Sequence, residues 1–350
     1  MGFMWGASLL VLALVSSMAV ADPLVPSLTI FGDSVSDVGN NNNLITLIRA
    51  NFPPYGRDFA EHRPTGRFSN GKLAIDLTAE FLGFDTYPPP YLSEDEASLG
   101  SVLTGANFAS GASGMLDATA HLYGAVSLTR QLENYKEYRA GVESRIGFEN
   151  ATNTFSKGIH LLSTGTSDFI QNYYVNPILK TLYTPDQWSN KLMKSYAKFI
   201  QNLYGLGARK IGVTTLPPTG CLPAAITLFG HGSNDCVERL NWDASSFNQK
   251  LNTTSQSLVQ GLPGLTLVVF DIYNPLLNLI KNPSDNGFAE ARKACCGTGV
   301  LETSFLCNAM SPGTCSNATE YVFWDGFHPS EAANKILAQS LLSQGLSLIS

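Results

Sequence analysis

Short apolar runs alternate with longer amphipathic patterns along most of this chain, and that alternation limits the folds open to it. Runs of five or six apolar and β-branched residues that end near Gly, Asp, Ser or Pro are typical of buried strands. Apolar residues spaced by three and four are typical of helices that cover a sheet. The alternation of these strand and helix patterns along the chain predicts an α/β fold with a central five-stranded parallel sheet. The expected strands span residues 27–31, 104–108, 159–163, 210–214 and 265–270, and the expected helices span residues 73–81, 128–138, 188–203, 241–259 and 332–342.

The composition favours one large globular domain. Of the 350 residues, 44% are hydrophobic and 14% are charged, and the net charge is −6. A chain of this length can bury a substantial core. Because no basic surface is available to neutralise phosphates, nucleic acid is a poor candidate partner. No repeat or linker divides the chain, so we expect residues 22–350 to form a single domain.

The N-terminal segment has the pattern of a secretory signal peptide. Residues 1–21 carry no charged side chain, and an apolar run ends in Ala19-Val20-Ala21, the small-x-small sequence that signal peptidase cleaves. Cleavage would leave Asp22 as the first residue, without a stable membrane insertion. An uncleaved anchor is the alternative, although the apolar run is short for a bilayer span of about 20 residues. Three glycosylation sequons agree with secretion; they begin at Asn150, Asn252 and Asn317.

The six cysteines fit an oxidising compartment and allow three disulfides. Cys221 with Cys236 would close a short local loop. The remaining four, Cys295, Cys296, Cys307 and Cys315, could staple the segment before the C-terminal motif. The sequence leaves the connectivity of all six cysteines open. A zinc site is not expected, because no histidine lies at ligand spacing from these cysteines and no Cys-x-x-Cys pair occurs.

Two irregular stretches are long for connections inside a compact domain. Residues 51–70 and 221–236 mix Pro, Gly and aromatic residues. Loops of this length are often binding loops or lids. We therefore expect both to form walls of a substrate pocket.

One segment places a serine where a substrate can reach it. An apolar strand runs directly into Gly32-Asp33-Ser34. In open α/β sheets the ligand crevice lies outside the carboxyl ends of the strands. Ser34 is therefore a candidate nucleophile. It is equally compatible with an ordinary N-cap of a following helix.

A second segment, near the C-terminus, holds one of only five histidines. In Asp325-Gly326-Phe327-His328-Pro329, an Asp three residues before a His can bond the imidazole Nδ1 and leave Nε2 free to accept a serine proton. The alternative is that Asp325 fixes a turn and His328 is a surface residue.

Together the two segments resemble the plant GDSL esterase/lipase family of the SGNH hydrolase superfamily. Residues 31–40 match the family's opening block F-G-D-S-x-x-D-x-G-N, and residues 325–329 match its closing block D-x-x-H-P. Intermediate stretches are also similar to the family's. These are Arg67-Phe68-Ser69-Asn70-Gly71-Lys72, Gly105-Ala106-Asn107-Phe108-Ala109-Ser110-Gly111, Gly165-Thr166-Ser167-Asp168 and Leu216-Pro217-Pro218-Thr219-Gly220-Cys221.

The resemblance implies a three-layer α/β/α flavodoxin-like fold and a catalytic triad. In that triad Ser34 attacks the acyl carbon, His328 moves the proton and Asp325 orients His328. A serine hydroxyl is hardly ionised at neutral pH, so it requires such a base. We expect no cofactor and no metal.

The resemblance also implies an oxyanion hole built from the N–H of Ser34, a glycine N–H and a side chain of the third block. The glycine matches Gly111 best, with Gly114 as the alternative. Where the family usually has Asn, this chain has Ser167. Loss of one oxyanion donor costs about 2.7–4 kcal/mol. Ser167 is expected to donate directly or through water; the alternatives are a donor from Asn172 or Thr166, or low activity.

Other polar residues are expected to have structural roles. Asp33 and Asp37 are expected to fix the turn after the first strand and to cap a following helix. Asp168 is expected to brace its own loop by accepting backbone N–H bonds. The remaining histidines, expected to be structural or on the surface, are His62, His121, His160 and His231.

The leading functional hypothesis is a secreted esterase or lipase that hydrolyses lipid or acylated small-molecule esters through an acyl-serine intermediate. We expect it outside the cell, in the apoplast or cell wall. An acyltransferase that uses the same triad is a second hypothesis. Since Ser167 departs from the family pattern, a catalytically weak binding protein is a third.

Overall fold

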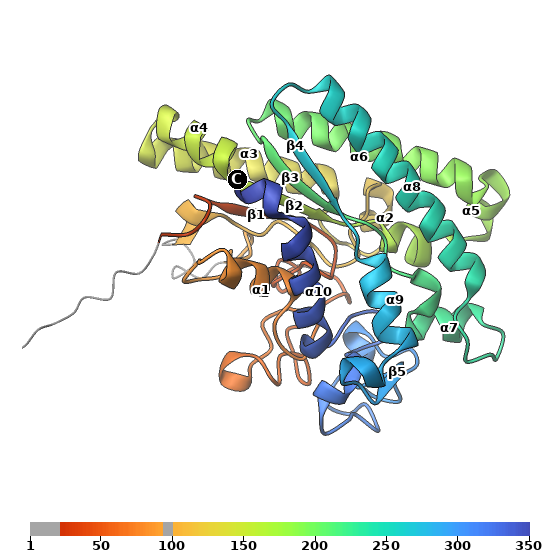
Figure 1. Ribbon diagram of the computed structural model, residues 1–350. Coiled ribbons are helices and arrows are strands. Elements are labelled where there is room, and N and C mark those ends of the chain that lie inside the picture. The colour runs from red at the N-terminus through yellow and green to blue at the C-terminus, as the bar shows by residue number, and fades with distance from the viewer. Residues whose placement is uncertain (1–21, 94–100) are drawn as a thin grey trace, which may run out of the picture.

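A central parallel sheet organises the computed structural model, which describes residues 22–93 and 101–350 (Figure 1). The expected signal peptide, residues 1–21, lies outside the described residues. Four strands pair side by side in the order β1-β2-β3-β4. Their register aligns Leu28 with Ile159, Ile159 with Lys210, and Lys210 with Thr266. The strands are β1 (Leu28–Gly32), β2 (Ile159–Ser163), β3 (Lys210–Thr214) and β4 (Thr266–Phe270).

The prediction of a fifth strand over residues 104–108 is wrong. This segment does lie beside β1, where Ile30 N donates to Ala106 O at 3.1 Å and Phe108 N donates to Ile30 O at 2.7 Å. The pairing amounts to an isolated bridge between Ile30 and Asn107. Thr104 ends a 3-10 helix, and Gly105 follows it at a φ of 131°. Too few residues remain extended to build a ladder, although the apolar pattern is that of a strand.

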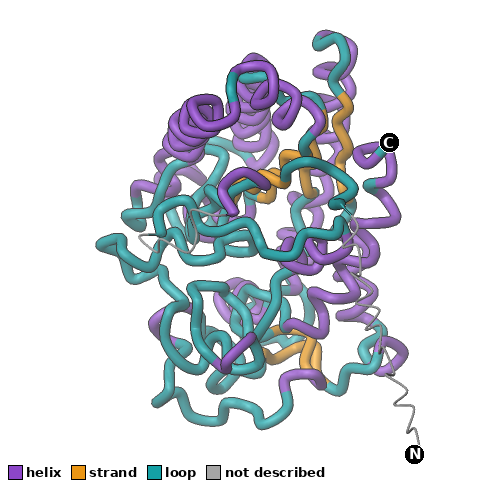
Figure 2. The backbone as a smooth tube through the Cα atoms, turned by 90° about the vertical axis from the view of Figure 1, so that its left-hand side faces the viewer, coloured by secondary structure: helices purple, strands orange, loops and turns teal. Residues whose placement is uncertain are grey.

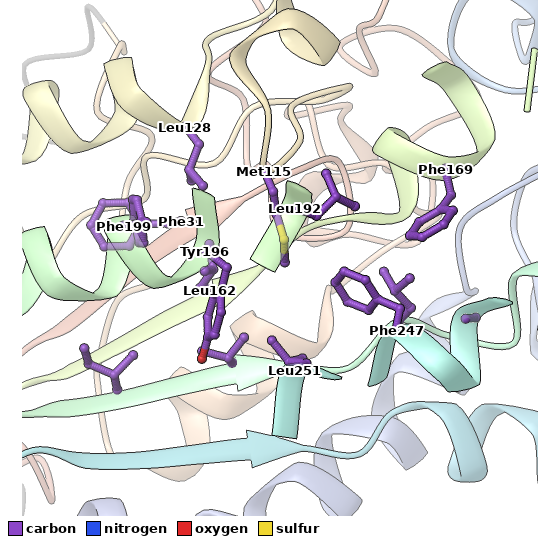
Figure 3. Close-up of a cluster of buried hydrophobic side chains, with 14 of the residues drawn as sticks. Phe31, Met115, Leu128, Leu162, Phe169, Leu192, Tyr196, Phe199, Phe247 and Leu251 are labelled. Carbon is purple, nitrogen blue, oxygen red and sulfur yellow. The ribbon is translucent and has the colours of Figure 1, made fainter. Parts of the chain in front are cut away.

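Long helices cover one face of the sheet. Alternate strand residues such as Phe31, Leu162 and Ile211 pack with them in the larger hydrophobic core, because successive side chains of a strand point to opposite faces. Figure 3 shows Tyr196, Phe199 and Leu251 meeting the sheet residues there. The apolar residues spaced by three and four in the expected helix 188–203 are therefore part of the core. The helices are α3 (Leu128–Ile146), α6 (Pro185–Gly205) and α8 (Glu238–Gly261).

The opposite face is covered by shorter helices, which Figure 1 shows beneath the sheet. Leu28, Ile30 and Phe270 point to this side and pack in a second core cluster. The sheet thus lies between two helical layers, as expected. The elements on this face are α1 (Ala74–Phe81), α10 (Glu331–Gln344) and α11 (Leu346–Ile349).

The remaining helices are mostly short and lie in the connections. The α-helices are α2 (Asp117–His121), α4 (Phe148–Lys157), α5 (Pro177–Leu182), α7 (Pro223–Phe229) and α9 (Tyr273–Lys281). The 3-10 helices include Ala60–His62, Ser101–Thr104, Thr219–Cys221, Ser284–Asn286, Ser304–Leu306 and Ala318–Glu320, and Asp168–Tyr173 is a π-helix. No helix within 22–93 or 101–350 is long and apolar enough to cross a membrane.

A small two-stranded sheet and two disulfides organise the C-terminal region. Strand β5 (Glu290–Ala294) pairs in parallel with β6 (Tyr321–Phe323). Figure 2 shows that loops make up most of the layer around this sheet. All six cysteines are paired, so the expected three disulfides are confirmed. The pairs are Cys221–Cys236, which closes the short loop considered above, Cys295–Cys315 and Cys296–Cys307; the sequence left this connectivity open.

Truncation of Leu162 should destabilise the protein strongly. Its side chain is 1% exposed and fills the core between the sheet and the long helices. Leu162→Ala is expected to lower the free energy of unfolding by about 2–5 kcal/mol, because it removes buried methyl groups and leaves a cavity. Urea denaturation measures the change. Leu122→Ala is the control: Leu122 is 60% exposed, so a comparable loss there would contradict this account of the core.

Candidate active site

Ser34 and His328 are in contact although they come from opposite ends of the sequence. Ser34 lies in a turn just after β1, at the carboxyl end of the sheet. His328 follows β6, and its Nε2 lies 2.7 Å from Ser34 Oγ. The chain after Ser34 turns without forming a helix, so Ser34 is not an N-cap. At hydrogen-bond distance the imidazole can accept the serine proton.

Asp325 orients the imidazole from its other side. Its Oδ1 lies 2.7 Å from His328 Nδ1 and also accepts the backbone N–H groups of Phe327 and His328, both at 2.9 Å. Asp325 is fully buried. The two backbone bonds fix the carboxylate relative to the same turn that carries the histidine. A buried carboxylate so held keeps the ring tautomer that leaves Nε2 facing the serine.

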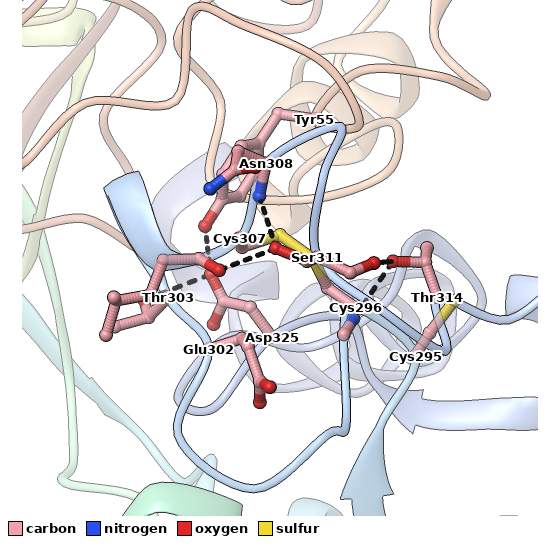
Figure 4. Close-up of a disulfide and its surroundings, with 12 residues drawn as sticks. Tyr55, Cys295, Cys296, Glu302, Thr303, Cys307, Asn308, Ser311, Thr314 and Asp325 are labelled. Atoms are coloured by element: carbon pink, nitrogen blue, oxygen red, sulfur yellow. Dashed lines mark hydrogen bonds between the residues drawn. A yellow bond between two sulfur atoms is a disulfide. The ribbon is translucent and has the colours of Figure 1, made fainter.

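Tyr55 is a contact of the candidate site that the sequence analysis missed. Its hydroxyl donates to Asp325 Oδ2 at 2.6 Å, and it accepts the N–H of Ser304 at 2.7 Å. Thr303 adds a longer bond to the same Asp325 oxygen, at 3.2 Å. Figure 4 shows Tyr55, Thr303 and Asp325 beside the Cys296–Cys307 disulfide. Burial and the adjacent Asp325 carboxylate raise the pKa of Tyr55 well above its usual value, so the phenol remains a proton donor.

No sequence motif pointed to Tyr55. It lies in the irregular stretch 51–70, 270 residues from Asp325, and only the fold brings the two together. The same stretch contributes Phe68, whose ring centroid lies 5.1 Å from that of His328. The expectation that residues 51–70 and 221–236 wall a pocket is met in part. Phe68 and Leu222 line the cavity beside His328, but most of its wall comes from other elements.

Asp37 locks the turn after β1 to the loop that carries Gly111. Its Oδ1 accepts the N–H groups of Gly39 and Asn40 at 2.8 Å, and its Oδ2 accepts the N–H of Gly111 at 2.9 Å. The donor that the sequence analysis assigned to the oxyanion is therefore engaged with Asp37. Burial raises the pKa of Asp37 to about 6, although these N–H bonds favour the carboxylate.

Asp33 has a more local role in the same turn. Its carboxylate accepts the N–H of Val35 at 3.3 Å, and burial raises the pKa of Asp33 to about 7. The predicted turn-fixing roles of Asp33 and Asp37 are confirmed. Their predicted role as caps of a following helix is wrong, because the chain after them forms turns and bends.

Asp168 braces a different loop from the one predicted. Its carboxylate accepts the N–H groups of Met115 and Leu116 and the Thr119 hydroxyl, at 2.6, 3.3 and 2.6 Å. These residues follow Gly111 and Gly114, not Asp168 itself. The prediction that Asp168 holds its own loop is corrected accordingly. Burial raises the pKa of Asp168 to about 6.

The third block presents Ser167 and its neighbours close to the strand ends. Ser167 is 4% exposed, and Thr166 lines the cavity beside His328. Asn172, the predicted alternative donor, already donates to the Thr119 hydroxyl at 2.9 Å. That bond weakens the case for Asn172 and leaves Ser167 and Thr166.

The other histidines lie away from this cluster. His62, His121 and His231 are exposed. His160 is buried on β2, where its Nε2 lies 2.7 Å from the Tyr135 hydroxyl and burial lowers its pKa to about 4. Their predicted assignment to the surface or the structural interior is confirmed. Within the described ranges, no group of three or more His, Cys, Asp and Glu residues is arranged to hold a metal ion.

Comparison with known proteins identifies the family. Residues 28–341 match the family described as GDSL-like lipase/acylhydrolase. This chain belongs to that family. Its relatives in Arabidopsis thaliana include GDSL esterase/lipase At5g03820, which is 67% identical over 96% of this chain and 95% of its own length. GDSL esterase/lipase At5g03810 is 66% identical, over 96% and 95%. GDSL esterase/lipase APG is 56% identical, over 98% of each chain.

The GDSL family membership confirms the resemblance predicted from the sequence blocks. The matched residues include the opening block with Ser34 and the closing block with Asp325 and His328. In this GDSL protein the two blocks meet at one site through a chain of hydrogen bonds that runs from Tyr55 to Ser34.

Removal of the Tyr55 hydroxyl should slow catalysis without weakening substrate binding. Tyr55→Phe leaves Asp325 Oδ2 and Ser304 N with one partner fewer, so the support of the His328 turn is lost. A hydrogen bond to a charged group contributes about 1.5–3 kcal/mol, and we expect kcat to fall about tenfold with KM nearly unchanged.

Steady-state kinetics on an activated ester measures the split between kcat and KM. Tyr204→Phe is the matched control, because the Tyr204 hydroxyl donates to Pro263 O at an exposed position. Equal losses in the two variants, or a change confined to KM, would remove Tyr55 from the positioning chain.

Proposed function

We propose that this chain is a secreted carboxylic-ester hydrolase in which Ser34 forms an acyl-serine intermediate. The contact that carries the proposal is the 2.7 Å approach of His328 Nε2 to Ser34 Oγ. Membership of the GDSL family, and relatives named esterase/lipase over nearly the whole chain, support the reaction class. No cofactor or metal is required.

The proposed mechanism uses the histidine twice. His328 Nε2 takes the Ser34 proton as Oγ attacks the acyl carbon, and Asp325 stabilises the imidazolium that forms. The tetrahedral intermediate collapses when His328 returns the proton to the leaving alkoxide, which departs as an alcohol. Water then attacks the acyl-serine by the same route and releases the carboxylic acid.

The oxyanion hole is proposed to use the Ser34 N–H and Ser167. Because Gly111 N already donates to Asp37 Oδ2, it is not free to donate to an oxyanion in the resting protein. Gly114, the alternative glycine, then becomes the better proposal for the second block. The Ser167 hydroxyl reaches less far than the amide that the family usually has, so it is proposed to donate directly or through a water.

Secretion and glycosylation remain part of the proposal. Three disulfides agree with an oxidising compartment such as the apoplast or cell wall. Residues 1–21 are the proposed signal peptide, which makes residues 22–350 the proposed mature domain. The side chains of the proposed acceptors are exposed, as glycosylation requires; they are Asn150, Asn252 and Asn317.

Replacement of the proposed nucleophile tests the reaction. Ser34→Ala should abolish burst release of alcohol from an activated ester and should prevent labelling by a serine-directed phosphonate, because both require Oγ. The rate should fall at least about 1,000-fold, as for loss of a triad member. Unchanged hydrolysis by Ser34→Ala would refute the mechanism. Product analysis with a competing alcohol separates hydrolysis from acyl transfer.

A weak catalyst or binding protein is the second candidate, and Ser167 is the observation that favours it. Ser167→Asn restores the family's usual donor. If the oxyanion site limits turnover, this variant should gain up to about 100-fold in kcat, since one such donor contributes a hundredfold or more. Steady-state kinetics measures the gain, with Ser144→Asn, at an exposed serine, as the control. An unchanged kcat would mean that Ser167 already serves as donor or that the site does not use this position.

A further inference from the structure

An apolar cavity of about 130 Å³ runs from the candidate active site beneath the sheet. At one end it is lined by Asp33, Val35 and His328, which adjoin Ser34. At the other end it is lined by Leu348 and Ile349 of α11. The cavity therefore follows the sheet face that α1 and α10 cover, shown beneath the strands in Figure 1.

The cavity spans the whole length of one strand. Its lining includes Ile159, the first residue of β2, and Ser163, the last. At about 3.3 Å per residue, the two lie about 13 Å apart. The far end is closed by α11, whose Leu348 is 1% exposed. We refer to this cavity, whose lining extends from His328 to α11, as the channel.

The wall becomes apolar with distance from the active site. Of the described residues that line the cavity, Asp33 and His328 are the ionisable ones, and both lie at the active-site end. Several polar lining residues are bonded within the protein: Thr215 Oγ1 accepts the N–H of Ile272 at 3.0 Å, and Asn334 donates to Lys72 O at 3.2 Å. The deeper wall consists largely of aliphatic side chains, among them Leu82, Leu161, Leu337 and Leu341.

We propose that this channel receives the acyl chain of the substrate, and that the chain is a straight aliphatic one rather than acetyl. The inference rests on the proposed ester hydrolysis and adds its substrate class. Polar groups at one end and aliphatic groups beyond them match an acyl ester, whose carboxyl carbon must lie at Ser34 and whose tail is apolar. A dry apolar cavity of about 150 Å³ can hold a six-carbon ring, so this slightly smaller one has room for about six carbons of a straight chain.

The channel should make the reaction rate depend on acyl length. Each methylene that leaves water for an apolar site contributes about fourfold to kcat/KM, which corresponds to about 0.8 kcal/mol. We expect kcat/KM to rise from the acetate through the butyrate to the hexanoate and octanoate esters of one alcohol. The rise should end where the channel is full.

A bulky side chain at Thr78 tests the path of the acyl chain. Thr78 of α1 lines the channel midway along the helix, and its hydroxyl donates to Ala74 O at 2.9 Å. Thr78→Phe should lower the ratio of octanoate to acetate kcat/KM at least about tenfold, because the ring occupies the space of several methylenes. Thr181→Phe is the matched control: this exposed helical threonine donates in the same way to Pro177 O, at 3.0 Å.

A binding measurement keeps the test decisive if Thr78→Phe folds poorly. Ser34→Ala protein should bind octanoate saturably, with the negative heat-capacity change of apolar burial, and should bind acetate far more weakly. Calorimetry at two temperatures measures both. The channel proposal would be overturned if octanoate does not bind, or if the wild type hydrolyses the octanoate and acetate esters with equal kcat/KM.

The outcomes separate this inference from the proposed function. Full activity of Ser34→Ala would refute the triad whatever the acyl preference. A different set of results would refute the channel and leave the proposed esterase intact. Hydrolysis would be lost in Ser34→Ala, kcat/KM of the wild type would not depend on acyl length, and Thr78→Phe and Thr181→Phe would have the same ratio of octanoate to acetate kcat/KM.

Discussion

The contact between His328 and Ser34 is the constraint on which the site depends. It joins positions 294 residues apart at a distance of 2.7 Å, so every element between them must fold correctly for it to form. The parallel sheet fixes the serine at a strand end, and the small β5-β6 sheet fixes the histidine turn. Asp325 connects the two parts because it holds the imidazole and is itself held by Tyr55. Catalytic geometry is thereby tied to the global fold rather than to one loop.

Buried carboxylates hold the loops around this contact. Asp37 ties the turn after β1 to Gly111, and Asp168 ties the third block to Met115 and Leu116. Each carboxylate accepts backbone N–H groups that a loop cannot satisfy in a ladder, which is the usual condition for burying polar groups. Burial raises the pKa of both acids to about 6, and the backbone N–H bonds partly offset this effect. Asp37 and Asp168 thus act mainly as structural supports of the loops around Ser34.

The two faces of the sheet are packed differently. The face under α3, α6 and α8 is filled by aromatic and aliphatic side chains and supplies most of the core. The face under α1 and α10 leaves an apolar cavity whose lining includes His328. A close-packed core tolerates few such voids, since each forfeits dispersion contacts. A void continuous with the active site is more consistent with a substrate site than with a packing defect.

The sequence by itself determined the α/β class, four of the strands, the main helices and the residues Ser34, Asp325 and His328, because these follow from local periodicity and short motifs. It misassigned residues 104–108, where the apolar pattern of a strand meets a 3-10 helix and Gly105. Only the tertiary structure decided the pairing of the last four cysteines, the engagement of Gly111 by Asp37, and the support of Asp325 by Tyr55. Those contacts join segments far apart in the chain, and local pattern carries no information about which distant segments come to lie together.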